Sequence, residues 1–205
     1  MKKARHPPPR RYRQTARAEA AEATGRRILD AFERRFNGAW FEDVHLKDVA
    51  RDAGVTVQTI FRKFGGKDGL LNAVSEPARR MSFRRALARG DRRSTIRALI
   101  DDYEAMGDFI HRLLAQEDKH PSLRPMADFG RAKHRAWVAE YFAPNLAGLS
   151  EAEKQLHIDG LVVALDFYVW KLVRRDLKRP IEDLQAIMER LVDGILGAAT
   201  RAKSR

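Results

Sequence analysis

The 205-residue sequence contains no cysteine. Disulfide scaffolds, zinc modules with cysteine ligands, iron–sulfur clusters and thiol nucleophiles are therefore excluded. Long apolar runs are also missing, since the longest stretch without a charged residue is the ten residues from Tyr141 to Ser150. A membrane-spanning helix needs about 20 apolar residues, and no apolar segment of a secretory signal follows the basic N-terminus. These absences predict a soluble, cytoplasmic protein without a membrane partner.

Acidic residues are absent from the first 14 positions, which carry six basic ones. The chain has a net charge of +12, and most of this excess lies before residue 92. Such asymmetry favours a polyanionic partner for the N-terminal part, either nucleic acid or an anionic membrane surface. The alternative is a solvated basic face that only keeps the protein soluble. Apolar residues make up 44% of the chain, which is enough to build a folded core.

Apolar residues recur at helical spacing along most of the chain, and no alternating strand pattern longer than four residues is present. The sequence therefore predicts an all-α fold of about nine helices, in which a three-helix N-terminal domain precedes a larger helical bundle. We expect four regions, which are a flexible basic arm over residues 1–14, a first domain over 15–66, a connecting helix over 67–91 and a second domain over 92–205.

Two helix boundaries in the second domain are predicted from capping residues. Ser150 and Glu153 form the pattern of a capping box, which should open a helix from about residue 151 to residue 177. Pro180 is well placed as the first residue of a last helix, because proline lacks only a backbone donor that is unpaired there.

Two short helices joined by a glycine turn are predicted between residues 45 and 64. Ala50 is small enough for the helices to pack closely, Gly54 supplies a left-handed turn, and Ile60 fills the contact between them. This is the arrangement of a helix-turn-helix, whose second helix lies in the major groove of DNA with its N-terminal residues toward the base edges.

The residues at the start of the second helix suit base recognition. The side-chain amide of Gln58 can form two hydrogen bonds with one base. Thr56 and Thr59 carry hydroxyls, and Val57 offers an apolar contact for a thymine methyl group. Basic residues that can meet phosphates follow at Arg62, Lys63 and Lys67.

The string from Phe41 to Leu71 resembles the DNA-binding domain of the TetR (tetracycline-repressor-like) family of transcriptional regulators. The likeness rests on an aromatic before the motif, a Val-Ala pair at 49–50, an Ala-Gly-Val turn at 53–55, the closing Phe64 and a Lys-acid-x-Leu-Leu start at 67–71. It implies a ligand-responsive homodimer, commonly a repressor, that binds a pseudo-palindromic operator in double-stranded DNA and is released by a small-molecule effector. It implies neither catalysis nor a cofactor.

The resemblance assigns Thr56 to a helix cap and a phosphate, residues 57–59 to bases, and Lys67 to the DNA backbone. This chain departs from the usual pattern, which has Tyr at Phe61, His or Tyr at Lys63, and a Thr pair at 44–45. A phenolic hydroxyl is therefore missing at Phe61. Val44 cannot cap the first helix of the motif, which leaves Asp43 and His45 as candidates for its cap. The full expected DNA-binding set is His45, Lys47, Thr56, Val57, Gln58, Thr59, Phe61, Arg62, Lys63 and Lys67.

The second domain has enough bulky side chains to line a small-molecule cavity, although aromatic residues at helical spacing also form ordinary cores. The resemblance implies an effector pocket there. The residues expected in it are Tyr103, Met106, Phe109, Phe129, Trp137, Tyr141, Phe167 and Trp170.

The last two helices of the second domain are apolar on more than one face, which favours one face for the domain's own core and the other for a symmetry mate. A centrally buried helix in a monomer is the alternative.

Three other interpretations compete with the regulator. The first is a small helical enzyme whose acid/base site comes from Asp101, Asp102, Glu104, Asp108 and His111. The second is a basic protein that binds nucleic acid by charge alone. The third is a metal site in which Asp108 and His111 meet His134 or His157. The basic arm has its own alternatives, which are insertion into the minor groove and plain attraction to phosphates.

Overall fold

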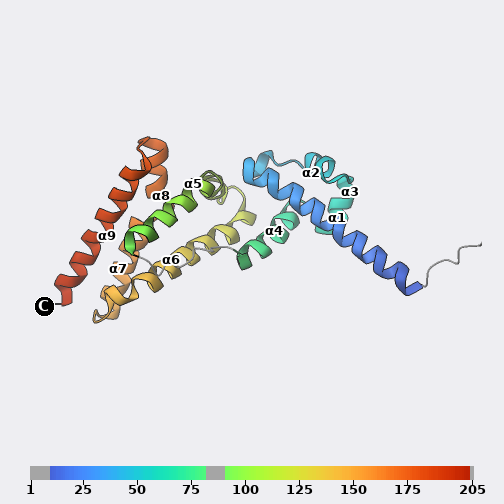
Figure 1. The fold of residues 1–205 in the computed structure, drawn as a ribbon. Helices are drawn as coiled ribbons and strands as arrows, with labels where there is room; N and C mark the ends of the chain where they lie inside the picture. Colours follow the sequence, from blue (N-terminus) through green and yellow to red (C-terminus); the bar gives the residue numbers. More distant parts are fainter. Residues whose placement is uncertain (1–9, 82–90, 204–205) are drawn as a thin grey trace, which may run out of the picture. The chain divides into compact units, whose positions relative to one another are not determined.

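The computed structural model describes residues 10–81 and 91–203, with side chains at 18–75 and 91–200. All secondary structure in these ranges is helical, which confirms the all-α expectation (Figure 1). The chain folds as two compact units, Met1–Ala78 and Arg79–Arg205, and each is described by itself below. Within the described residues, no helix has an apolar stretch long enough to cross a bilayer.

The first unit has four helices, which are α1 (Arg10–Gly38), α2 (Leu46–Ala53), α3 (Val57–Phe64) and α4 (Lys67–Met81), with the 3-10 turn η1 (Phe41–Asp43) after α1. Its core joins one stripe of α1 to the short helices, because Ile28 and Phe32 are buried together with Val49 of α2 and Ile60 of α3. Leu70 and Leu71 bring the start of α4 into the same unit and are also buried.

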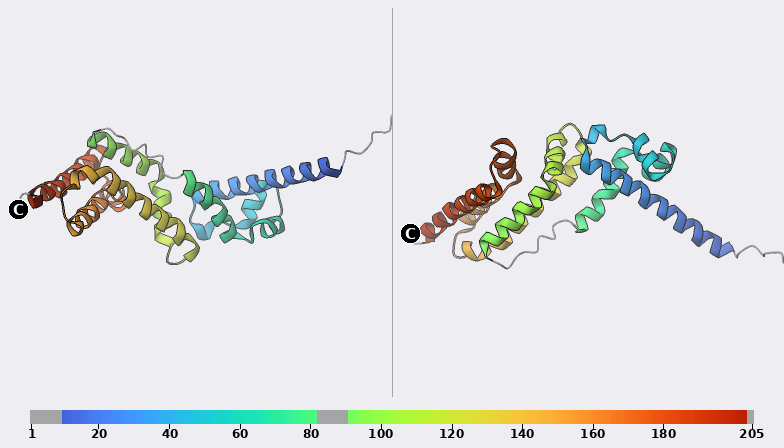
Figure 2. Two further views of the ribbon diagram at one scale, coloured as in Figure 1. Left: turned by 90° about the horizontal axis from the view of Figure 1, so that it is seen from below. Right: turned by 45° about the horizontal axis from the view of Figure 1, so that its top comes forward.

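Helix α1 is longer than the sequence pattern predicts. It begins at Arg10, so residues 10–14, which we expected in the flexible arm, belong to a helix, while residues 1–9 lie outside the described part of the chain. The N-terminal half of α1 runs past α2, α3 and α4 in every ribbon view (Figures 1 and 2). Residues 18–22 are exposed there and are alanine and glutamate, which favour a helix without tertiary contacts.

The second unit contains α5 (Arg92–Gln116), η2 (Pro121–Leu123), α6 (Arg124–Leu146), α7 (Glu151–Ala164), α8 (Phe167–Trp170), the π-helical turn η3 (Lys171–Asp176) and α9 (Ile181–Lys203). These elements share one apolar core, in which the fully buried Trp170 lies beside α5. The Trp170 ring covers Gly107, where a Cβ atom would lie only 2.2 Å from the ring.

The single helix expected from about 151 to 177 is wrong. Ser150 and Glu153 do form the predicted capping box, but α7 ends at Ala164. The Asp166 carboxylate then accepts a hydrogen bond from the Tyr168 N–H at 2.8 Å and caps the new helix α8. Apolar periodicity does not detect this break, because a short polar side chain can bond the local backbone in place of the helix without changing the pattern around it. The last helix begins at Ile181, directly after Pro180.

Candidate nucleic-acid interface

The turn between α2 and α3 has the geometry that its residues predict. Gly54 adopts a left-handed conformation with φ 66° and ψ 41°, and Ala50 and Ile60 are buried on the two sides of the turn. His45 precedes α2, but neither it nor Asp43 caps the helix, since the His45 side chain makes no capping hydrogen bond and Asp43 lies in η1. The expectation that one of these two residues caps α2 is therefore not met.

Charged side chains attach α2 to α1. The Arg35 Nε donates to the Asp52 carboxylate at 2.6 Å, and the Arg27 Nε donates to the carbonyl of Ala53 at 3.3 Å. The hydrogen bond from Arg35 holds the pKa of Asp52 below its usual value. These contacts set the position of the two short helices on α1.

Helix α3 presents polar and basic side chains to solvent. Thr56 caps it as predicted, because its hydroxyl accepts from the Thr59 N–H at 3.2 Å. The two threonine hydroxyls are 3.0 Å apart, so Thr56 fixes the rotamer of Thr59 as well. Gln58, Arg62 and Lys63 are exposed, whereas Ile60 points into the core. The exposed face therefore combines an amide for base edges with two cations for phosphates.

Lys67 differs from the other cations of the expected set. Its Nζ donates to the carbonyl of Phe41, lies 3.4 Å from the carbonyl of Glu42 and sits 4.2 Å from the centre of the Phe41 ring. Burial lowers the pKa of Lys67, an effect partly opposed by Asp68, Asp43 and Glu42. In this conformation the ammonium holds η1 against the start of α4 instead of pointing into solvent.

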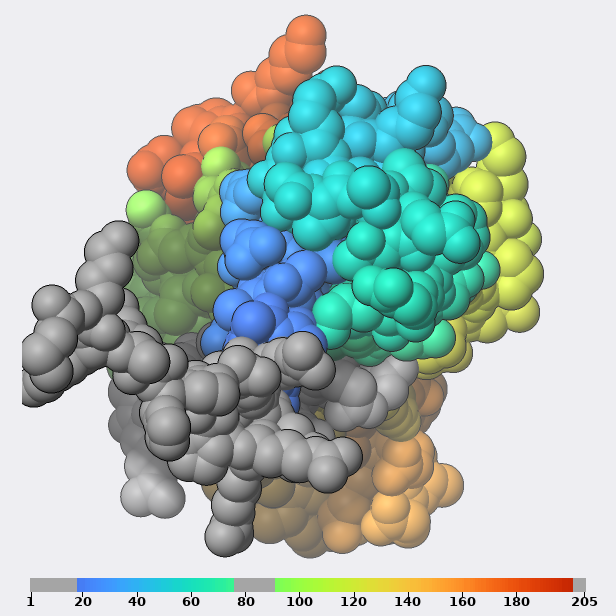
Figure 3. Space-filling view, turned by 90° about the vertical axis from the view of Figure 1, so that its right-hand side faces the viewer, coloured from blue at the N-terminus to red at the C-terminus, as the bar shows by residue number. Residues whose placement is uncertain are grey.

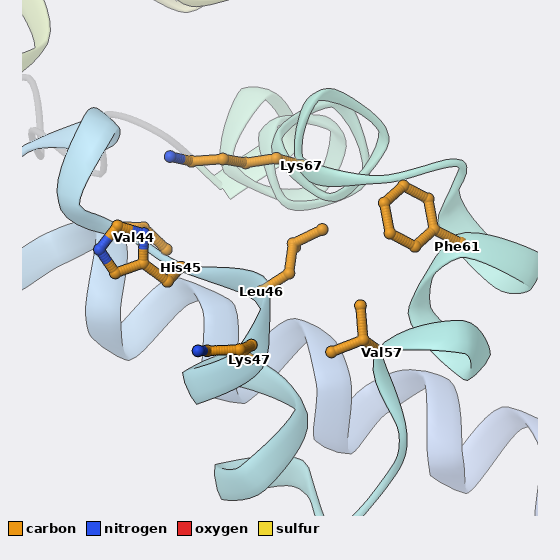
Figure 4. Close-up of a pocket in the computed structure, with 7 residues that line it drawn as sticks. All are labelled: Val44, His45, Leu46, Lys47, Val57, Phe61 and Lys67. Carbon is orange, nitrogen blue, oxygen red and sulfur yellow. The ribbon is translucent and has the colours of Figure 1, made fainter.

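A hollow of about 550 Å³ opens between the start of α2, one flank of α3 and the first turn of α4 (Figure 4). We call it the reading-helix hollow, and its lining residues are Val44, His45, Leu46, Lys47, Val57, Phe61 and Lys67. The close-up shows the Leu46 and Val57 side chains directed into it, with Phe61 at one end and Lys67 along one side (Figure 4). Five of the lining residues belong to α2, α3 and α4, and Val44 and His45 lie in the segment before α2. Five of the seven, which are His45, Lys47, Val57, Phe61 and Lys67, belong to the expected DNA-binding set. Leu46 and Val44 were not in that set, because their apolar side chains carry no signal of a binding role in the sequence.

The elements that line the hollow form a continuous surface in the space-filling view, where the segment from α2 to the start of α4 lies beside α1 (Figure 3). Residues 28–74, which cover the C-terminal part of α1, both short helices and the first half of α4, match the family model described as "Bacterial regulatory proteins, tetR family". Over these residues the chain is similar to the DNA-binding domain of TetR-family regulatory proteins.

Two solved structures share the fold of this chain. A transcriptional regulator from Rhodococcus sp. Rha1 is 18% identical, with a TM-score of 0.59 over 84% of this chain and 96% of that one. A protein assigned as a transcriptional regulator from Pseudomonas aeruginosa PAO1 is also 18% identical, with a TM-score of 0.58 over 90% of this chain and 94% of that one. No curated protein sequence matches the chain. At such low identity these likenesses concern the fold alone.

The eight residues expected to line an effector pocket in the second unit lie in different environments. Tyr103, Phe167 and Trp170 pack as one buried aromatic cluster, with the Phe167 and Trp170 ring centres 5.4 Å apart. The Tyr103 hydroxyl donates to the carbonyl of Leu165 at 3.1 Å. Met106 is 53% exposed, so the structure does not bring it into that cluster.

The remaining members of this set lie on α5 and α6. Trp137 and Tyr141 stack with ring centres 5.9 Å apart, while Phe109 and Phe129 are half-buried. The assignment of the eight residues to an effector stays a prediction.

Three of the acidic residues in the enzyme interpretation take part in ion pairs within the second unit. Glu104 binds Arg174, Asp108 binds Arg175 at 3.1 Å and Asp101 binds Arg97 at 2.9 Å. Within the described residues, no three histidine, aspartate or glutamate side chains gather where they could hold a metal ion.

Two histidines of the metal interpretation contact backbone carbonyls. His157 Nδ1 lies 2.7 Å from the Glu153 carbonyl, and His134 Nε2 lies 3.4 Å from the Val162 carbonyl. Both contacts lie within the second unit.

Proposed function

We propose that this chain is a homodimeric, ligand-responsive transcriptional regulator that acts as a repressor in the cytoplasm. It binds a pseudo-palindromic operator through its two N-terminal units and leaves the DNA when a small-molecule effector binds the second unit. The observation that carries the proposal is the exposed face of α3, where Gln58 stands between the capped first turn and the cations Arg62 and Lys63.

The DNA contact follows from the orientation of α3. Ile60 holds one side of the helix in the core, so Gln58 and Arg62, one turn apart, project from the opposite side. In a helix-turn-helix this side enters the major groove, and its first turn reaches the base edges. Gln58 would then read a base, while Arg62 and Lys63 neutralise phosphates on either side.

The dimer is supported by apolar side chains that the second unit leaves in solvent. Leu156 and Val163, both on α7, are 70% and 66% exposed, and Leu191 on α9 is also exposed. The two helices pack closely, since a Cβ on Gly160 would lie 3.4 Å from the Ile195 side chain. A second copy of the chain would bury these side chains and would place two recognition helices about 34 Å apart, one turn of DNA.

The effector can release the DNA only if it prefers the conformation that does not bind the operator. A ligand with equal affinity for both conformations leaves the equilibrium unchanged. The half-buried Phe109 and Phe129, together with the exposed Met106, supply apolar surface for such a ligand in the second unit.

The experiment is selection of binders from a random duplex DNA library at near-physiological salt, followed by sequencing. An inverted repeat with two equal half-sites is the expected result. Survivors without a common sequence would overturn the proposal in favour of a protein that binds nucleic acid by charge alone. Absence of DNA binding would also overturn the proposal, and the activity of the chain would then have to lie in the second unit.

Two variants separate base reading from phosphate binding in that experiment. Gln58→Ala should relax the preference at one base position in each half-site. Lys63→Ala should weaken binding to every sequence alike and lower the slope of log affinity against log salt by about one unit.

A further inference from the structure

His45 occupies the N-cap position of α2, but its side chain does not act as a cap. The backbone there is extended, with φ −93° and ψ 133°, and the imidazole makes no capping hydrogen bond. A serine, threonine, aspartate or asparagine at an N-cap would direct its oxygen to the backbone of the first turn. The ring of His45 is instead exposed at the edge of the reading-helix hollow, where its nitrogens can meet a ligand.

Two lysine side chains accompany the imidazole at this edge. The close-up shows the nitrogen ends of Lys47 and Lys67 on the side of the hollow where the His45 ring lies (Figure 4). The two lysines come from different elements, since Lys47 is in the first turn of α2 and Lys67 is the first residue of α4. We call these three residues the basic edge. It brings together two amines and the imidazole, whose charge depends on pH near neutrality.

The carboxylates close to the basic edge are those of Glu42 and Asp43 in η1, Asp48 in α2 and Asp68 in α4. Asp48, three residues after His45, is bound by two arginines, with Arg51 at 2.8 Å and Arg35 at 3.8 Å. The other three act on Lys67, where their charges oppose the lowering of its pKa by burial. In the part of the chain that the structure describes, no carboxylate forms an ion pair with His45. A negative charge for its imidazolium form therefore has to come from a partner.

The DNA backbone can supply this charge. When α3 lies in the major groove, the first helix of the helix-turn-helix crosses the phosphates, and His45 is at the start of that helix. A phosphate beside the ring favours imidazolium over neutral imidazole, because an opposite charge stabilises the charged form. Histidine ordinarily changes its charge near pH 6.5, so this preference acts at physiological pH.

We propose that His45 takes up a proton when the chain binds its operator, so that acidification tightens operator binding. The imidazolium binds the phosphate more strongly than the neutral ring does. The gain in affinity is therefore present at acidic pH and is lost as the pH rises. Each protomer takes up at most one proton. This inference rests on the proposed function, because it needs α2 on the phosphates, and it adds pH to the effector as a signal that changes operator occupancy.

The test measures the affinity of the full-length protein for the selected operator from about pH 6 to about pH 8 at constant salt. The wild type should bind about tenfold more tightly at the acidic end, the effect of two exposed ion pairs in a dimer. His45→Gln, which has no titrating ring, should bind equally at all these pH values and about as weakly as the wild type at the alkaline end. His45→Lys, which carries a permanent cation, should bind at the alkaline end about as tightly as the wild type does at the acidic end.

Two other histidines supply matched controls. His6→Gln, in the N-terminal segment outside the described residues, and His157→Gln, in the second unit, should both keep the full pH dependence. Calorimetry in buffers of different ionisation enthalpy counts the protons directly. The wild type should take up protons when it binds the operator, and His45→Gln should take up none.

Three results separate this inference from the proposed function. A selective operator that the wild type binds equally at all these pH values would overturn the inference and leave the proposed function standing. A pH dependence that persists in His45→Gln would do the same, because other groups would then take up the proton. The absence of any selective operator would overturn both.

Discussion

At the residue scale, Gly69 in the first turn of α4 allows the backbone of α3 to approach. A Cβ at this position would lie 1.6 Å from the carbonyl oxygen of Phe64. No side-chain movement can relieve an overlap with a backbone atom. We expect Gly69→Ala to destabilise the first unit by about 3 kcal/mol or more, at the upper end of overpacking effects. Hydrogen exchange of the amides in residues 28–74 would measure this change.

Gly25 on α1 is the matched control in the same unit. A Cβ there would lie 3.6 Å from the Lys63 Nζ, which is an ordinary contact. Gly25→Ala should therefore stabilise the unit by about 1 kcal/mol, because alanine favours a helix interior over glycine. If Gly69→Ala and Gly25→Ala change the stability of the first unit alike, the close approach between Gly69 and the Phe64 carbonyl is wrong.

Lys67, which is expected at the DNA backbone, contacts η1 in this structure. Its ammonium holds the carbonyls of η1, so we expect Lys67→Met to destabilise the first unit by about 1–2 kcal/mol through the lost charged hydrogen bonds. Lys63→Met, a change on the exposed face of α3, should alter stability by less than about 0.5 kcal/mol. Hydrogen exchange without DNA distinguishes the two. If Lys67→Met and Lys63→Met are equally stable, the contacts of Lys67 with η1 do not stabilise the first unit.

At the element scale, an ionic network attaches the segment after α7 to α5. The Glu104 carboxylate accepts from Trp170 Nε1 at 2.7 Å, and from Arg174 Nε and Nη2 at 2.7 and 3.1 Å. The Arg174 guanidinium also donates to the Arg179 carbonyl at 2.5 Å. Three hydrogen bonds to one half-buried carboxylate thus hold α8 and the π-helical turn in place.

The network predicts a loss of stability in acid. The hydrogen bonds from Arg174 and Trp170 lower the pKa of Glu104 in the folded chain below its unfolded value of about 4.3. The stabilisation is therefore complete above that value and disappears as the pH falls through the folded pKa. Glu104→Gln should lower the free energy of unfolding by about 1 kcal/mol at neutral pH. It should also make that free energy fall less steeply below about pH 4.5.

Urea unfolding of the second unit at several pH values, followed by tryptophan fluorescence, measures this effect. Asp101→Asn is the control, because the Asp101–Arg97 pair is more exposed and contributes little. An unchanged pH dependence in Glu104→Gln would show that other carboxylates govern acid unfolding.

At the scale of the whole molecule, the proposed dimer depends on α7 and α9. Lysine at Leu156 and Val163 would place two charges on the apolar face. We expect the double substitution Leu156→Lys and Val163→Lys to raise the dimer dissociation constant about 30-fold or more and to weaken operator binding in parallel. Sedimentation at several protein concentrations measures the dimer dissociation constants of the wild type and of the double variant.

Ala132→Lys on α6 is the control for added charge, since Ala132 is exposed outside the proposed interface. It should leave the dimer intact. A wild-type chain that sediments as a monomer would contradict the interface, as would a double variant that remains a dimer.

The sequence by itself determined the helical class and the helix-turn-helix. Gly54, Thr56 and Ile60 act through local backbone geometry and short-range packing, so their spacing is sufficient to identify the turn, the cap and the contact between the helices. The capping box at Ser150 is predictable for the same reason, since both partners lie within one turn.

Only the tertiary structure decided the features that join distant segments. These features are the hydrogen bond from Lys67 to η1, the reading-helix hollow and the network between Glu104 and Arg174. Each combines residues that lie far apart in the sequence, so the apolar periodicity of single helices does not reveal it. The break at Asp166 was also decided by the structure, because a local side-chain hydrogen bond there competes with a helix that the apolar pattern would continue. Local preferences are encoded over a few residues, whereas these contacts depend on how the helices pack.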